Sequence, residues 1–279
     1  MSLNPDFHLP LGALAVMVLG TLVGVPAPPA AAQIPGVIEP FDAPSDLFLR
    51  ANRVYDYGRE VNNPAESRRA LNTAIPLFRE FLNTAPRHEF AEKAWYRLGM
   101  SLLLTGQIEE AERVFEGVIK RYRTGKYVAT SAYRLGAQRY NDSRWAAAAP
   151  YFGITARESD KPKLRHEALY YQARCLILAK DANGASRVLS KIIGDEGNPF
   201  ADYARLALGQ LRAAAGRHEE ALKDFELLLT PSTAPQERAQ ALLAAGVSAA
   251  KMENIELAEQ YLFQTLDSPG LDMKYKARA

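Results

Sequence analysis

One pattern of small and large residues recurs about every 37 residues along most of this chain. A small residue is followed twelve positions later by alanine and sixteen positions later by a large apolar residue. The sets are Gly99, Ala111 and Phe115; Gly136, Ala148 and Phe152; Ala173, Ala185 and Leu189; Gly209, Ala221 and Phe225; and Gly246, Ala258 and Leu262. Self-similarity at one period is typical of a solenoid, in which each unit buries its apolar face only against its neighbours.

The copy that begins at Trp95 indicates what each unit is. Trp95, Leu98 and Gly99 are spaced by three and four residues, so they share one face of a helix. Gly106 ends that helix, because glycine tolerates the left-handed conformation that a helix end needs. Ala111, early in a second helix, is small enough to let that helix lie close against Gly99. We therefore predict an antiparallel helix pair.

The small-residue positions, the A-x-x-x-F of the second helix and the leading Trp95 resemble the tetratricopeptide repeat, whose usual period is about 34 residues. The longer period here, with Pro86 shortly before an A-x-x-A helix start, is similar to the periplasmic branch that includes the BamD and Tol–Pal-associated YbgF proteins. The resemblance covers residues 46–279 and implies an all-α, right-handed superhelical solenoid of six antiparallel helix pairs plus the start of a seventh. It also implies a concave groove, lined by the first helices, that binds a partner protein or peptide in cell-envelope assembly or maintenance.

The N-terminal segment differs in composition from the repeats. Residues 1–32 contain an apolar core over 9–25 and then small residues, which predicts a secretory signal cleaved near Ala32–Gln33 and a periplasmic or otherwise exported protein. The leading segment carries Asp6 and no Lys or Arg, so an uncleaved membrane anchor is the alternative. Residues 33–45 are predicted to form a proline-rich linker.

The C-terminal residues 271–279 resemble the start of another first helix and then stop. A solenoid normally ends on a polar capping helix, so we favour a chain that continues beyond Ala279 over a short solvating cap. A second hypothesis follows, in which the repeats are the adaptor arm of a longer protein whose active part lies beyond residue 279.

The sequence offers little for catalysis. The formal net charge of +2 is too small to favour nucleic acid or an anionic membrane as the main partner. Cys175 is the single cysteine and is interpreted as a small core residue. His218–Glu219–Glu220 falls short of the H-E-x-x-H zinc motif, and the chain has no dinucleotide fingerprint or nucleophile turn. We predict a non-enzymatic protein with no catalytic residue, metal or cofactor, which contacts a membrane only through an uncleaved N-terminal segment.

Tyrosines and arginines recur on the expected first helices, and we call them the Tyr/Arg ladder. They are Tyr55, Tyr96, Arg97, Tyr133, Arg134, Tyr140, Tyr170, Tyr171 and Arg174. Tyr and Arg often anchor interfaces, because each combines a large contact area with hydrogen bonds. On a regular stack the ladder lines one wall of the groove and suits an extended or helical partner segment with acidic residues.

Two alternatives to ladder binding stay open. Tyrosine is common at this repeat position, so the ladder is explained equally well by packing. Leu206 and Leu243 replace the tyrosine in later repeats, which limits any groove site to the N-terminal half. An enzyme or a carbohydrate-binding solenoid would need carboxylates at these positions, where the chain has aromatic, basic or apolar residues.

Overall fold

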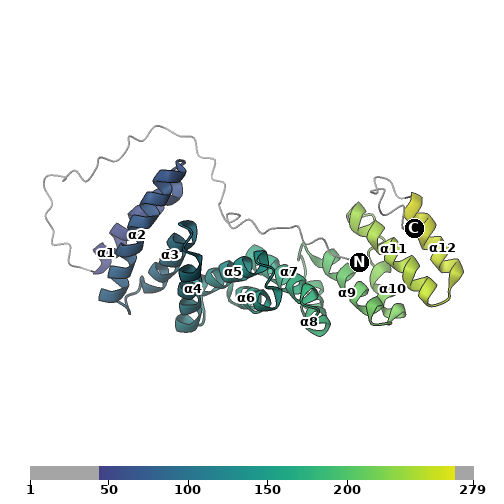
Figure 1. The fold of residues 1–279 in the computed structure, drawn as a ribbon. Helices are drawn as coiled ribbons and strands as arrows, with labels where there is room; N and C mark the ends of the chain where they lie inside the picture. The colour runs from purple at the N-terminus through teal and green to yellow at the C-terminus, as the bar shows by residue number, and fades with distance from the viewer. Residues whose placement is uncertain (1–43, 268–279) are drawn as a thin grey trace. The chain divides into compact units, whose positions relative to one another are not determined.

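The structure is a computed structural model that describes residues 44–267. Within this range it contains twelve helices and no strand, so the prediction of an all-α fold is confirmed (Figure 1). The chain divides into two compact units, Met1–Asn141 and Asp142–Ala279, which are described separately below. The predicted signal, most of the predicted linker and the predicted start of a seventh pair lie outside the described residues.

Unit 1 contains two complete helix pairs and one further helix. Its helices are α1 (Pro44–Glu60), α2 (Pro64–Thr84), α3 (Ala91–Leu104), α4 (Ile108–Tyr122) and α5 (Lys126–Asn141). Consecutive helices pack against one another, and α3 also contacts α1 and α5. The first helices of successive pairs are therefore neighbours, as the solenoid prediction requires.

Unit 2 begins with one helix and continues with three pairs. Its helices are α6 (Trp145–Glu158), α7 (Pro162–Leu178), α8 (Ala182–Ile193), α9 (Ala201–Ala214), α10 (His218–Glu226), α11 (Pro235–Lys251) and α12 (Ile255–Asp267). Consecutive helices again pack together, and α9 contacts α11. No helix among residues 44–267 combines the length and the apolar character needed to cross a membrane.

The turn inside each pair repeats with the period of the sequence. A positive φ occurs at Gly106 (88°), Ser143 (58°), Lys180 (61°), Gly216 (76°) and Glu253 (61°). Successive members of this set are 36 or 37 residues apart. The left-handed turn predicted from the glycine at 106 is therefore present, and it recurs where the residue is not glycine. At Lys180 and Glu253 the left-handed conformation costs about 1–2 kcal/mol, which the packing of the two flanking helices must offset.

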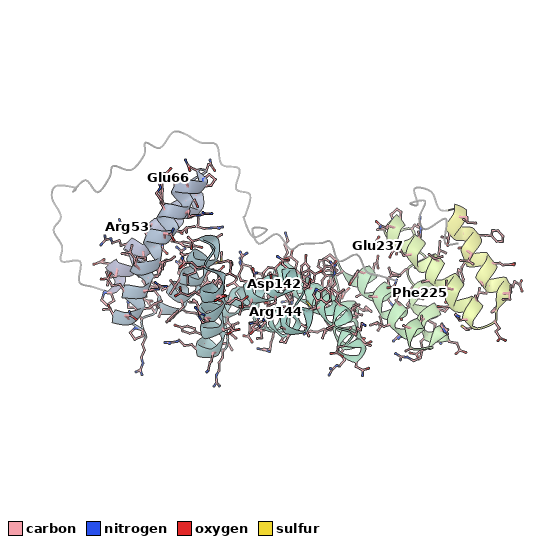
Figure 2. All side chains as sticks on the ribbon, viewed as in Figure 1. Arg53, Glu66, Asp142, Arg144, Phe225 and Glu237 are labelled. Atoms are coloured by element: carbon pink, nitrogen blue, oxygen red, sulfur yellow. The ribbon has the colours of Figure 1, made fainter. Side chains whose placement is uncertain are left out.

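In the α3–α4 and α9–α10 pairs a phenylalanine of the second helix lies against a glycine of the first helix. A Cβ built on Gly99 would lie 2.6 Å from Cε1 of Phe115, and one on Gly209 would lie 2.5 Å from Cε1 of Phe225. Phe225 is labelled in Figure 2. The glycine thus accommodates the ring sixteen residues later. This differs from the contact with Ala111 that the sequence suggested, because the phenylalanine ring of the second helix reaches across to the first helix.

The positions predicted for repeat packing are buried with one exception. Those buried are Leu98, Gly99, Ala111, Phe115, Gly136, Ala148, Phe152, Ala173, Ala185, Gly209, Ala221, Phe225, Gly246 and Ala258. Trp95 is only half-buried, and the guanidinium carbon of Arg121 lies 5.3 Å from the centroid of its ring. Gly136 and Ala148 belong to different units, so their pairing stays a prediction.

Candidate functional site

The described residues contain no cluster of three or more His, Cys, Asp or Glu side chains that could hold a metal ion. Cys175 is buried, and burial raises the pKa of its thiol to about 12. Since the thiolate is the reactive form, this side chain remains a protonated core residue at neutral pH. The candidate site is therefore sought among the exposed and half-buried side chains of the described residues.

The Tyr/Arg ladder divides by burial into two sets. Four members are no more than 8% exposed, namely Tyr55, Tyr133, Arg134 and Tyr140. Five members are half-buried, namely Tyr96, Arg97, Tyr170, Tyr171 and Arg174. A buried side chain cannot contact a partner without leaving its packed position, so only the half-buried set is accessible. Tyr96 and Arg97 belong to unit 1, and the other three belong to unit 2.

In unit 1 the guanidinium of Arg97 is held by the preceding helix pair. Its Nη1 lies 2.7 Å from Oδ1 of Asp56, and its Cζ lies 4.6 Å from the centroid of the Tyr55 ring. Burial raises the pKa of Tyr55 to about 12, so this ring stays neutral beneath the cation. The sequence analysis did not identify Asp56. The one available signal was its place directly after Tyr55 on the same helix.

Further cations surround Arg97 on α3 and at the start of α5. The pKa of Lys93 is lowered, first by burial and then by repulsion from Arg97 and Lys126, while Asp56 opposes the change. The three positive charges are thus close enough to interact, against one carboxylate.

Two aromatic rings accompany these charges. The rings of Tyr96 and Tyr127 are 5.4 Å apart, and Nζ of Lys126 lies 5.5 Å from the Tyr127 centroid. We define the cationic strip as Lys93, Arg97 and Lys126 together with Tyr96 and Tyr127. Lys126 is exposed and the other four members are half-buried, so a partner reaches all of them.

Glu92 fixes the start of α5 against α3. Burial raises the pKa of this carboxyl, and hydrogen bonds from the backbone N–H groups of Tyr127 and Val128 act in the opposite direction. A carboxylate at the first turn of a helix also interacts favourably with the positive end of the helix dipole. Glu92 therefore positions the two strip residues that α5 contributes.

In unit 2 the accessible ladder members pack on one another and on neighbouring aromatic rings. The Tyr170 ring is stacked on Phe200 at a centroid distance of 4.5 Å and makes edge contacts with Tyr171 and Tyr203. Arg174 donates a hydrogen bond from Nη1 to the hydroxyl oxygen of Tyr170 at 3.1 Å. These contacts favour the packing interpretation for this part of the ladder.

Comparison with known proteins agrees with this architecture. The model of the tetratricopeptide repeat family matches residues 93–124, which span most of α3 and all of α4. This helix pair is thus similar to a tetratricopeptide repeat. No curated protein sequence matches the chain.

Two solved structures have a similar fold. One is the crystal structure of YrrB, described as a TPR protein with an unusual peptide-binding site. Its TM-score is 0.52 at 19% identity, covering 72% of this chain and 96% of that one. The other is the crystal structure of MamA, with a TM-score of 0.52 at 17% identity, covering 68% and 97% of the two chains. At these identities the likeness shows the fold alone, which is a TPR-like solenoid.

Proposed function

We propose that this protein is an exported TPR scaffold that binds an acidic segment of a partner protein through the cationic strip. The observation that carries the proposal is the concentration of positive charge at the strip, where Lys93, Arg97 and Lys126 interact and Asp56 is the carboxylate paired with Arg97. YrrB, which has a similar fold, is described as having a peptide-binding site, which supports a peptide or protein partner here.

The contacts of Arg97 explain why the partner should be acidic. Asp56 is 42% exposed and compensates only one of the three positive charges. A partner carboxylate would compensate the remaining positive charge. It could form an ion pair with Lys126, which pairs with no carboxylate among the described residues. Tyr96 and Tyr127 would add contact area beside the charges. Because exposed charges are screened by salt, binding should weaken as ionic strength rises.

The place of action is proposed from the sequence. The predicted signal in residues 1–32 and the elongated repeat both support export, with a role in assembly or maintenance of the cell envelope. Mass spectrometry of the N-terminus in a fractionated cell tests this part. A mature chain that begins at Gln33 in the exported fraction supports it, and an intact leader in the cytoplasm would refute it.

Binding is tested by adding residues 33–279 as bait to an envelope extract and identifying the proteins that crosslink to it. The strip variant carries K93Q, R97Q and K126Q. A control variant loses the same charge at three exposed positions of unit 2, through K163Q, R187Q and K191Q. A partner retained by the control and lost by the strip variant would support the proposal.

Equal retention by both variants would place binding elsewhere. Equal loss from both would indicate attraction to net charge alone. Circular dichroism of each variant establishes that the comparison is made between folded proteins.

A further inference from the structure

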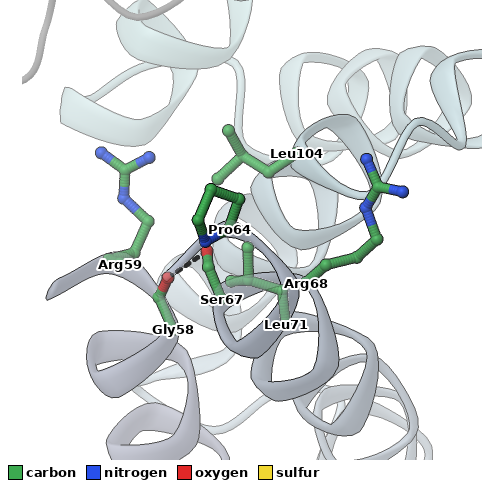
Figure 3. A pocket seen from close by; sticks show the side chains of 7 residues that line it. All are labelled: Gly58, Arg59, Pro64, Ser67, Arg68, Leu71 and Leu104. Carbon is green, nitrogen blue, oxygen red and sulfur yellow. Dashed lines mark hydrogen bonds between the residues drawn. The ribbon is translucent and has the colours of Figure 1, made fainter. Parts of the chain in front are cut away.

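The first repeat contains a pocket that the cationic strip does not include. The pocket has a volume of about 230 Å³ and is lined by the end of α1, the first two turns of α2 and the end of α3 (Figure 3). Its apolar side chains are Pro64, Leu71 and Leu104. Leu104 is one of the few large apolar side chains of unit 1 that is at least 36% exposed. The pocket therefore offers a small apolar surface to solvent.

The pocket exists because the first repeat is irregular. The interval from Gly58 to Ala74 is sixteen residues, against twelve from Gly99 to Ala111. The additional chain lengthens the second helix, since α2 has 21 residues and α4 has 15. The first two turns of α2 supply four of the seven lining residues. In the second pair α4 begins only three residues before Ala111, so it lacks these early turns.

Two arginines give the pocket its charge. Arg59 and Arg68 both line it, both are exposed, and in the view of Figure 3 Leu104 lies between their guanidinium groups. Neither guanidinium forms an ion pair with any described residue. The neighbouring acid, Glu66, accepts a hydrogen bond from the hydroxyl of Tyr57 and does not line the pocket.

The other polar groups near the pocket are already occupied. The Ser67 hydroxyl donates to the carbonyl oxygen of Gly58 at 2.6 Å. The side chain of Asn63 accepts hydrogen bonds from the backbone N–H groups of Ala65 and Glu66, which open α2. An anion in this pocket would thus be held by the two guanidinium groups rather than by the end of the helix.

We propose that this first-repeat pocket binds a carboxylate that carries a short aliphatic group. Its volume corresponds to about seven or eight water molecules at about 30 Å³ each, which suits a group of leucine size. Pockets for drug-sized ligands are larger, at about 300–1,000 Å³. Guanidinium groups bind carboxylates by charge-assisted hydrogen bonds, and the aliphatic part would cover Leu104. This inference is independent of the cationic strip.

Binding is measured by NMR titration of the full chain with N-acetyl-leucine as the probe. The neutral counterpart is N-acetyl-leucinamide. The pocket variant is R59Q/R68Q, and the matched control is R53Q/R69Q, which removes two exposed arginines of α1 and α2 that do not line the pocket (Figure 2 labels Arg53). We expect the pocket variant to bind N-acetyl-leucine about tenfold more weakly or worse, because both charge-assisted hydrogen bonds to the carboxylate are lost. The control should bind like the wild type.

Each outcome decides the proposal. No binding to the wild type, equal binding of the amide, or equal loss in both double variants would overturn it. A capped peptide of sequence GLEG, with GLQG as its counterpart, separates the two sources of the carboxylate. Arginine-dependent binding of GLEG would assign the ligand to an acidic segment of a protein, whereas binding of N-acetyl-leucine alone would assign it to a chain terminus or a small organic acid.

Discussion

Replacing Gly99 with alanine tests how the two helices of a pair meet. The new Cβ would lie 2.6 Å from Cε1 and 2.9 Å from Cδ1 of Phe115, whose side chain is only 2% exposed. Overpacking of this kind costs about 1–3 kcal/mol. The cost should exceed the gain of about 0.8–1 kcal/mol that alanine usually provides over glycine inside a helix. We therefore expect a lower free energy of unfolding, measured by urea denaturation followed by circular dichroism.

A second glycine of the same unit supplies the control. Gly117 lies on the exposed side of α4, and a Cβ built there meets no heavy atom within 4 Å. Gly117→Ala should therefore stabilise the chain by about 0.5–1 kcal/mol, the opposite sign. Combining Gly99→Ala with Phe115→Leu should recover part of the loss, because the flat ring edge is removed. Stabilisation by Gly99→Ala, or no recovery in the double variant, would refute the contact that we describe.

Three further predictions concern the turns, pH dependence and the ion pair. Lys180→Gly and Glu253→Gly should each stabilise the folded chain by about 0.5–1 kcal/mol. Glycine removes the cost of about 1–2 kcal/mol that an L-residue has in the left-handed conformation, and it loses about 0.5–1 kcal/mol in chain entropy. A lower midpoint of urea denaturation would contradict this. Burial raises the folded-state pKa of Glu92 above 4.5, so the folded chain binds this proton more tightly and stability should fall as the pH rises from 4.5 through the raised pKa. Glu92→Gln should flatten that part of a stability–pH curve, and an unchanged slope would exclude this group as its source. A double-mutant cycle with Asp56→Asn and Arg97→Gln should give a coupling energy of about 0.2–1 kcal/mol, because the side chain of Asp56 is substantially exposed. A much larger coupling energy would mean that the ion pair is shielded from solvent.

The repeat period predicted the helix pairs well, because burial against a neighbour requires the same small residue at the same place in every copy. Gly106 was recognised as a turn from its residue type. Ser143, Lys180 and Glu253 adopt the same left-handed conformation, yet their residue types carry no such signal. At Lys180 and Glu253 the conformation is imposed by the two packed helices that the turn joins. All three positions could be found only by extending the period.

Burial of the ladder could not be predicted from the period alone. Tyr55 and Tyr96 were assigned to the same ladder, but Tyr55 packs edge-on against Phe78 and is 7% exposed, whereas Tyr96 is half-buried beside Tyr127. The difference depends on how each pair sits against the next one. Asp56 escaped notice for the same reason, since its partner Arg97 belongs to the following pair and is 41 residues away.

The contrast between Arg97 and Arg174 separates packing from binding within the ladder. Arg174 donates to a tyrosine hydroxyl four residues earlier on its own helix, so this hydrogen bond stabilises a local aromatic cluster. Arg97 pairs with a carboxylate of another helix and lies among further cations that lower the pKa of Lys93. Like charges placed together weaken the fold unless something compensates them. The repulsion among the cations on α3 and at the start of α5 is best explained if a carboxylate of a partner compensates it. We therefore place the proposed contact at the cationic strip and not along the whole ladder.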